Sequence, residues 1–378
     1  MMQSLKRLYA DFRGFDEVGS AVPMMDGPLK PNTALDQAPI TLNLPDIDNL
    51  TAVPGGLACS QGRMLLRLES AMQTDGLPAL KAVSERSLPA DISCLATDGE
   101  KALAIGCDGQ GIEIHGGRHH GLRIEAVNGT KLGAPTAALF LDPDTLIIAN
   151  GSADYGMADW KRDLMNHGSS GSIWRVSLGA QVQPAVLLAQ NLAFPYGLAA
   201  APENKLLVSE SWRHRVISID AASPQPPRIV LADLPAYPAR ITSSESGYWL
   251  ALFAPRNQLV EFVLREEAYR RKMVANIDPA YWIAPALVSG ISFLEPIQGG
   301  ARKKLNMLKP WSPSWSYGLV VQCDKAMRPI ESFHSRADGH VHGVTSLSEY
   351  GGYLFVAAKG SGAVVALNAQ SAEADSNR

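Results

Sequence analysis

The sequence predicts an all-β fold made of one repeated unit, and three observations support this prediction. Short runs of β-branched and other apolar residues recur along the 378-residue chain, separated by Gly, Asp, Asn and Pro. The runs group into six units of roughly 40–60 residues each. The hydrophobic fraction of 46% and the charged fraction of 19% are typical of a folded globular chain. Together these observations predict a six-bladed β-propeller.

Each predicted blade opens with a small or polar residue before an apolar stretch, passes a turn, and returns as an apolar strand. In blade one the segments are 48–59 and 64–68. In blade two they are 92–95, 102–105, 111–115 and 121–127, and in blade three they are 134–137, 146–150, 172–177 and 184–189. In blade four they are 194–198, 206–210 and 215–219, and in blade five they are 237–241, 248–252, 258–263 and 317–323. In blade six they are 342–345, 353–357 and 363–367. The sixth blade is one strand short, so we expect residues 40–44 to complete it and leave no open edge.

Two segments interrupt the repeat. Residues 264–312 begin with a helical pattern and carry Trp282 and Trp311, which predicts a helical insertion in blade five, packed over one face of the propeller. A second insertion is expected at 151–171. We therefore expect an N-terminal extension at 1–37, the propeller at 38–370 and a flexible tail at 371–378.

Composition narrows the range of functions. The net charge is −3 and there is no run of five like charges, so neither nucleic acid nor a membrane surface is expected as a partner. The N-terminus lacks the apolar run of a secretory signal. The four cysteines have no CxxC spacing, and we interpret them as reduced core residues of a cytoplasmic protein, with Cys94 and Cys107 on neighbouring strands. The oligomeric state is left open.

Three segments carry patterns of a known family: residues 194–198 (Phe-Pro-Tyr-Gly-Leu) followed by 206–216, residues 247–252 (Gly-Tyr-Trp-Leu-Ala-Leu), and residues 317–320 with 342–359. In these segments the chain resembles the strictosidine synthase-like and gluconolactonase-type (senescence marker protein-like) six-bladed propellers, over roughly residues 40–370. Strictosidine synthase-like proteins also carry a helical insertion where this chain has 264–312. The resemblance implies the fold, whereas one propeller scaffold hosts unrelated chemistries.

Residues just before the first strand of each blade face one mouth of the central channel. Aligning the six units puts at this mouth Asp48, Ala90, Thr136, Tyr196, Ala239 and His342. The gluconolactonase-type pattern implies a Glu, two Asn and an Asp at four of these places, holding a divalent cation such as calcium. Here Asp48 is the one remaining carboxylate, and a hard cation prefers several oxygen ligands. We therefore expect no calcium site of the family kind, unless Asn150, Asp154 and Glu210 supply other oxygens.

A mixed polar cluster remains at the predicted mouth. His342 is the candidate general acid or base, and Asp48 either orients it or acts itself. Tyr196 and Arg240 are candidates for binding or polarising a carbonyl or carboxylate. Further substrate-binding candidates are Thr136, Asn150, Asp154, Glu210 and Trp249. The family's alkaloid-forming reaction uses a glutamate whose position appears here as Thr345, so that reaction is not expected.

The favoured function is a small-molecule hydrolase of the lactone or ester type, acting at the central mouth. Alternatives are a strictosidine synthase-like condensing or isomerising enzyme for a larger apolar substrate, and a non-catalytic propeller that binds a ligand or a protein. The shape of the mouth separates these alternatives. A pocket closed by both insertions favours a small molecule, and an open flat face favours a protein partner.

Overall fold

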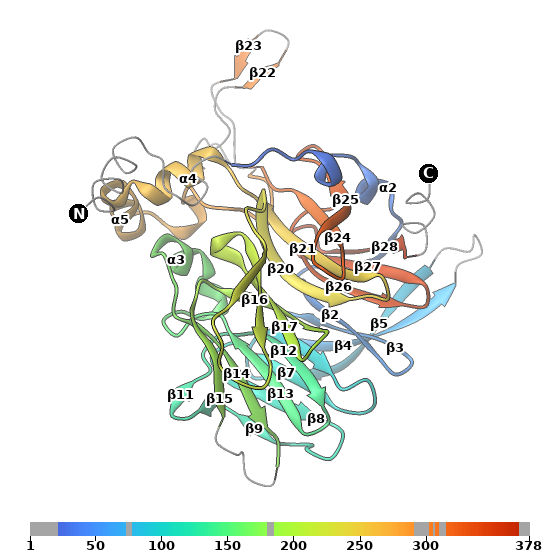
Figure 1. Ribbon diagram of the computed structural model, residues 1–378. Coiled ribbons are helices and arrows are strands. Elements are labelled where there is room, and N and C mark those ends of the chain that lie inside the picture. The colour runs from blue at the N-terminus through green and yellow to red at the C-terminus, as the bar shows by residue number, and fades with distance from the viewer. Residues whose placement is uncertain are drawn as a thin grey trace.

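The computed structural model describes residues 22–72, 78–179, 185–290, 302–304, 307–309 and 315–369. Six antiparallel four-stranded sheets follow one another around a central axis (Figure 1), which confirms the predicted six-bladed propeller. The blades follow chain order, and neighbouring first strands contact each other around the ring. Blade one contains β2 (Ile47–Val53), β3 (Gly56–Gln61), β4 (Met64–Met72) and β5 (Pro78–Ser87).

The remaining blades repeat this arrangement. Blade two contains β6 (Ile92–Thr97), β7 (Leu103–Cys107), β8 (Gly111–His115) and β9 (Arg123–Ile124), and blade three contains β12 (Pro135–Asp142), β13 (Thr145–Asn150), β14 (Gly171–Ser177) and β15 (Val186–Leu192). Blade four contains β16 (Pro195–Ala201), β17 (Lys205–Glu210), β18 (Arg215–Asp220) and β19 (Arg228–Leu231). Blade five contains β20 (Ala236–Ser243), β21 (Gly247–Pro255), β24 (Gly318–Asp324) and β25 (Pro329–Ser335).

Blade six is closed by the N-terminal strand, as predicted. Its own strands are β26 (Val344–Tyr350), β27 (Tyr353–Ala358) and β28 (Ala363–Asn368), and β1 (Ile40–Asn43) pairs antiparallel with β28. The Thr41 hydroxyl also donates a hydrogen bond to the Val364 carbonyl at 3.0 Å. The ring is therefore joined by hydrogen bonds between segments more than 300 residues apart.

The first strand of every blade has a register break near its start. A β-bulge leaves its extra residue out of the ladder and re-aims the side chain. The residues at these breaks are Asp48 and Asn49, Ser93, Thr136, Tyr196, Ala239 and Arg240, and Thr345. The alignment of the repeats therefore placed the residue at the register break correctly in four blades. In blades two and six it was three residues early, because Ser93 and Thr345 lie at the break rather than Ala90 and His342.

The insertion in blade five lies between β21 and β24. It contains α4 (Gln258–Arg265), α5 (Glu267–Asn276) and the short helix η4 (Pro279–Tyr281). The strand predicted at 258–263 is wrong, because the Asn257 side chain accepts a hydrogen bond from the Leu259 amide and begins a helix there. The buried residues of α4 then follow helical spacing, and β25 supplies the missing strand.

Other connections also carry short elements. The second insertion contains η2 (Met157–Asp159) and α3 (Trp160–Met165), and β17 leads into η3 (Ser211–Arg213). The segment predicted as one strand at 121–127 is divided between β9 and β10 (Ala126–Val127), which pairs with β11 (Thr130–Lys131), and β22 (Arg302–Lys304) pairs with β23 (Met307–Lys309). Trp311 and the predicted tail at 371–378 lie outside the described residues.

The described part of the N-terminal extension packs on the outer strand of blade five. It contains η1 (Gly27–Leu29) and α2 (Ala34–Gln37). The Asn32 side-chain amide donates to the Ser332 carbonyl, and its oxygen accepts from the His334 amide. Because β25 is the edge of its sheet, these two bonds satisfy backbone groups that would otherwise be unpaired.

All four cysteines are buried and free, and Cys94 and Cys107 lie on the neighbouring strands β6 and β7, as predicted. Burial raises the pKa of the Cys94 thiol to about 12, so it is not a reactive thiolate at neutral pH. Within the described ranges, no helix is long and apolar enough to cross a membrane.

Candidate functional site

A pocket of about 160 Å³ lies at one mouth of the propeller axis. A cavity of about 150 Å³ is large enough to hold benzene, so this space suits a compound with one ring. First strands of the blades, their connecting loops and both insertions contribute to the lining, which consists of Asp48, Asp91, Ile92, Ser93, Asp108, Met157, Ala158, Trp160, Phe194, Tyr196, Trp212, Phe253, Leu287 and Lys359.

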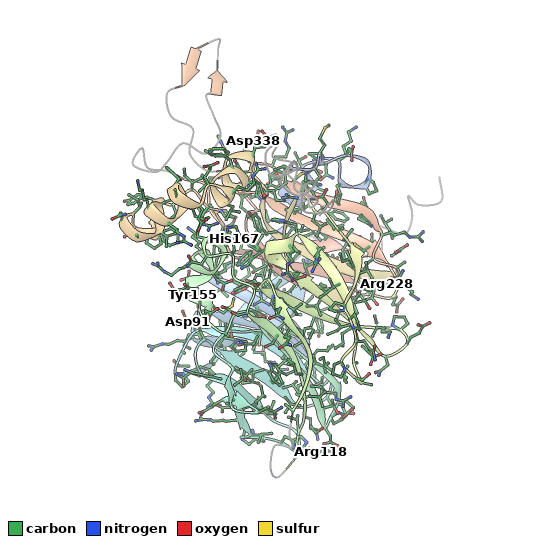
Figure 2. The ribbon with its side chains drawn as sticks, turned by 60° about the vertical axis from the view of Figure 1, so that its left-hand side comes forward. Asp91, Arg118, Tyr155, His167, Arg228 and Asp338 are labelled. Carbon is green, nitrogen blue, oxygen red and sulfur yellow. The ribbon has the colours of Figure 1, made fainter. Side chains whose placement is uncertain are left out.

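The two insertions meet beside this mouth. In Figure 1, α3 lies next to α4 and α5, and α3 and α5 are in contact. His167 Nε2 donates to the Leu264 carbonyl at 2.9 Å, and the Arg162 guanidinium lies 5.1 Å from the Trp282 ring centroid. Figure 2 shows His167 and Tyr155 of the second insertion on the same side of the molecule as the lining residue Asp91. The mouth is thus a walled pocket rather than an open face.

A buried carboxylate held by two cations forms the floor of the pocket. Arg240 Nη1 donates to Asp48 Oδ1 at 2.7 Å, and Lys359 Nζ donates to Asp48 Oδ2 at 2.8 Å. The three residues come from blades one, five and six. Burial alone would raise the pKa of Asp48, but Lys359 and Arg240 outweigh it and hold this pKa well below the usual range of a carboxyl. Asp48 is therefore an anion at any physiological pH.

Arg240 is fixed on several sides. Its guanidinium also donates to the Thr345 carbonyl at 3.2 Å and to the Ser93 carbonyl at 2.7 Å, and it lies 4.9 Å from the Tyr196 ring centroid. These contacts tie together bulges of four blades. Burial together with the Asp48 charge raises the pKa of the Tyr196 phenol, so Tyr196 remains neutral.

Lys359 is the accessible member of the floor. Its side chain is 36% exposed, against 6% for Asp48 and 11% for Arg240. The charge of Asp48 raises the pKa of Lys359, so its amine stays protonated. An ammonium group has three hydrogens and Asp48 accepts one of them, which leaves donors for a ligand in the pocket.

Aromatic side chains form one wall above this floor. Phe194 stacks on Trp212 with centroids 4.4 Å apart, and Trp160 stacks on the same indole at 6.1 Å. Phe253 meets Trp160 and Tyr196 edge to face. The Trp212 indole N–H donates to Asp163 at 2.6 Å, which fixes the orientation of the wall.

The opposite wall is polar. Asp108 accepts hydrogen bonds from the backbone amides of Met157 and Ala158, so it anchors the start of η2 over the mouth. Asp91, which also lines the pocket, is exposed. Leu287 of the larger insertion closes the pocket beside Lys359. A side chain on Gly360 would lie 2.0 Å from the Leu287 carbonyl, so a glycine is required at that close approach.

These residues do not fit a calcium ion. Both oxygens of Asp48 already accept hydrogen bonds from cationic groups, and the Thr136 hydroxyl donates to the Pro195 and Ala149 carbonyls. Ala239 has no ligand atom in its side chain. Among the described residues, no group of three or more His, Cys, Asp and Glu side chains is arranged to hold a metal. Two cationic side chains thus surround the carboxylate on which such a site would depend.

His342 lies apart from the pocket lining. Its Nε2 donates to the Arg336 carbonyl at 2.8 Å, and its Nδ1 accepts from the Ser316 hydroxyl at 2.6 Å. Burial is the main reason why the pKa of His342 is below its usual value. The structure therefore does not bring His342 to Asp48, its predicted partner, and both ring nitrogens are already engaged.

Some of the other predicted site residues lie at the floor of the pocket, and the rest lie away from it. Tyr196 and Arg240 join Asp48 at the floor, whereas Thr136 lies buried at its own bulge. Asn150 bonds to the Ala134 amide and the Ser152 carbonyl, and Glu210 is buried against Arg213 and Arg215. Asp154 is exposed and bonds to Ser170, while the Trp249 indole donates to Glu349. Among these residues, Tyr196 alone lines the pocket.

Sequence reasoning missed Lys359, although a signal for it exists. Asn150 and Glu210, chosen as possible oxygen ligands, end the second strand of their blades. The residues directly after the second strands of blades two and six are Asp108 and Lys359. Both residues line the pocket.

A second cavity of about 180 Å³ continues the axis toward the other face of the propeller. Its lining comes from the first strands of all six blades, and Arg240 belongs to it. Because Arg240 also bonds to Asp48 of the pocket, its guanidinium separates the two cavities. The Arg240 Nε, facing neither Asp48 nor the carbonyls, has no partner within the described chain.

Comparison with known proteins supports the fold. No family model matches the chain, and no curated protein matches it. A solved gluconolactonase from Xanthomonas campestris matches with a TM-score of 0.51 and 12% identity, over 87% of this chain and 88% of that one. The calcium-binding protein regucalcin from Agrobacterium tumefaciens gives 0.47 at 12% identity, over 90% and 95%. A luciferin-regenerating enzyme gives 0.46 at 12%, over 84% and 85%.

At this level of identity the likeness establishes the fold alone. The chain is a six-bladed β-propeller, and its fold is similar to that of the solved gluconolactonase. It differs from the metal-binding pattern implied by that resemblance at its centre, where a carboxylate holds two cations of the chain itself.

Proposed function

We propose that the protein is a small-molecule hydrolase that acts on a lactone or ester at the mouth of the propeller. One observation carries the proposal: the Lys359 ammonium, held by Asp48, is accessible at the floor of a small pocket walled by aromatic rings. A fixed cation in a partly desolvated pocket stabilises the negative charge that develops on a carbonyl oxygen during acyl transfer.

The reaction adds water to the acyl carbon. The water oxygen bonds to that carbon, the acyl C–O bond breaks, one proton ends on the leaving alcohol oxygen and the other is released, and the products are a carboxylate and an alcohol. Lys359 donates a hydrogen bond to the carbonyl oxygen as charge develops there, and Asp48 with Arg240 holds the ammonium in place. Asp48 is a poor base because its pKa is held low, so Asp91, the exposed lining carboxylate, is the candidate acceptor of the water proton.

A panel of five- and six-membered lactones and aryl esters tests this proposal. The purified protein should hydrolyse at least one of them after treatment with a chelator. Lys359→Met should lower kcat by roughly 10²–10³-fold, the usual effect of removing one donor to the oxyanion. Lys272→Met, on the exposed face of α5, is the matched control and should keep wild-type activity. Absence of turnover across the panel, or equal turnover by Lys359→Met, would refute the proposal.

A second candidate is a propeller that binds a small molecule without transforming it. Both oxygens of Asp48 are salt-bridged, and this supports a fixed binding floor as well as a catalytic one. A ligand that raises thermal stability, with no turnover across the panel, would favour binding. The small pocket supports neither the larger substrate of a condensing enzyme nor a protein partner.

A further inference from the structure

The buried floor carries more positive than negative charge. Asp48 contributes one negative charge, and Arg240 and Lys359 contribute one positive charge each. Arg240 has two further partners, both backbone carbonyls, and Tyr196 beside it is neutral. A buried site with one uncompensated cation favours an anionic group from outside, because isolated charges are costly to bury.

Two more carboxylates line the pocket, but they lie in different surroundings. Both carboxylate oxygens of Asp108 accept hydrogen bonds from the backbone amides that begin η2, whereas Asp91 is exposed to solvent. Charges in contact with water are screened over about 10 Å at ordinary ionic strength, and buried charges are screened much less. The floor therefore dominates the interaction with a ligand that reaches Lys359.

The remaining surface of the pocket selects the body of the ligand. The aromatic wall of Trp160, Phe194, Tyr196, Trp212 and Phe253 offers apolar faces and edges, and the volume suits one ring. We propose that the pocket binds small cyclic carboxylates, with the carboxylate on Lys359 and the ring against this wall. The inference rests on the proposed function in one respect: hydrolysis of an ester whose acyl group carries a ring forms a cyclic carboxylate, so this acid product should bind more tightly than its neutral ester.

Three compounds of the same shape and different charge test this inference: benzoate, benzamide and benzylammonium. Isothermal titration calorimetry on the full chain should give an affinity for benzoate at least tenfold above those for the other two. A hydrogen bond to a charged partner is worth about 1.5–3 kcal/mol, so Lys359→Met should weaken benzoate binding by roughly 10- to 100-fold. Lys359→Arg should retain most of the affinity, and Lys272→Met should retain all of it.

The outcomes separate this inference from the proposed function. Benzoate binding that depends on Lys359 supports the inference even if the lactone and ester panel shows no turnover. Tighter binding of benzylammonium would overturn it and would assign the selectivity to Asp91 and Asp108. Absence of benzoate binding to a protein that hydrolyses lactones would also overturn it, while the proposed function would stand. Melting curves of each variant confirm that it is folded.

Discussion

The two ends of the propeller axis contain cavities of similar size, about 160 Å³ and 180 Å³, with different walls. The lining of the second cavity comes from the first strands of the blades alone, and therefore from the repeat. The pocket takes much of its lining from loops and insertions, including Trp160, Trp212 and Leu287. The repeat thus produces a hollow axis at both ends, and segments outside the repeat turn one end into a candidate site.

The largest expected effect concerns the carboxylate at the floor of the pocket. Asp48→Asn leaves Arg240 and Lys359 without their counter-charge, and breaking a buried pair in this way costs about 3–5 kcal/mol. The free energy of unfolding, measured with urea at pH 7, should fall by that amount. Asp159→Asn, whose side chain is 62% exposed beside Arg162, should have almost no effect. A similar stability for Asp48→Asn and wild type would show that the floor pair does not stabilise the axis.

The ion pairs of Asp48 also make the free energy of unfolding depend on pH. Because the pKa of Asp48 is lowered in the folded state, the folded protein binds fewer protons than the unfolded chain, and the contribution of Asp48 is present above the unfolded pKa of about 3.9. It is lost as the pH falls below that value. Urea midpoints between pH 7 and pH 3 should therefore decline more steeply for wild type than for Asp48→Asn. Parallel curves would contradict the assignment.

A smaller effect is expected from His342, which packs beside the mouth without lining it. His342→Ala removes two hydrogen bonds, at a cost of about 1–3 kcal/mol in unfolding free energy, although the Ser316 hydroxyl keeps its bond to Ser289 and the Arg336 carbonyl keeps its bond from the Gly339 amide. Because burial lowers the pKa of His342, the folded protein favours neutral imidazole, and its contribution to stability is lost as the pH falls below about 6.5. Turnover should remain at the wild-type rate. Loss of turnover in the folded variant would restore the catalytic role predicted from the sequence.

A substitution in the second cavity, at the other end of the axis, should have a smaller effect. The Thr242 hydroxyl donates to the Leu347 carbonyl at 2.7 Å, so Thr242→Val should cost about 1 kcal/mol in unfolding free energy. It should change neither turnover nor benzoate affinity, which enzyme kinetics and calorimetry would check. If turnover fell as it does for Lys359→Met, the division between the two ends would be wrong.

The smallest effect concerns calcium. A ligand that binds the native state raises the melting temperature, by mass action. Because both oxygens of Asp48 are engaged by cations, neither millimolar calcium nor a chelator should shift the melting temperature of the wild-type protein. A rise of several degrees with calcium, reversed by the chelator, would show that the floor rearranges around a metal.

Much of the fold was predictable from the sequence because the repeat is a local pattern. Short apolar runs between turn residues identified the six blades and the closing strand β1. The errors fell where the repeat is interrupted. Residues 258–263 are as apolar as a strand, but they form α4, because Asn257 caps a helix there and the buried residues follow helical spacing.

The site was only partly predictable because it depends on register and on contacts across blades. Asp48, Tyr196 and Arg240 were found because the bulges of three blades align well. His342 was placed three residues too early, since Thr345, at the register break of β26, holds the equivalent position. Lys359 meets Asp48 across 311 positions of sequence, a contact that no local pattern contains.

The most direct test compares the two ends of the axis in one assay. It measures kcat for the best lactone or ester with wild type, Lys359→Met, Lys359→Arg and Thr242→Val, each checked for folding. We expect a loss of roughly 10²–10³-fold for Lys359→Met, partial recovery in Lys359→Arg and a wild-type rate for Thr242→Val. A wild-type rate in Lys359→Met would show that the cation on Asp48 does not stabilise the reacting carbonyl at this mouth.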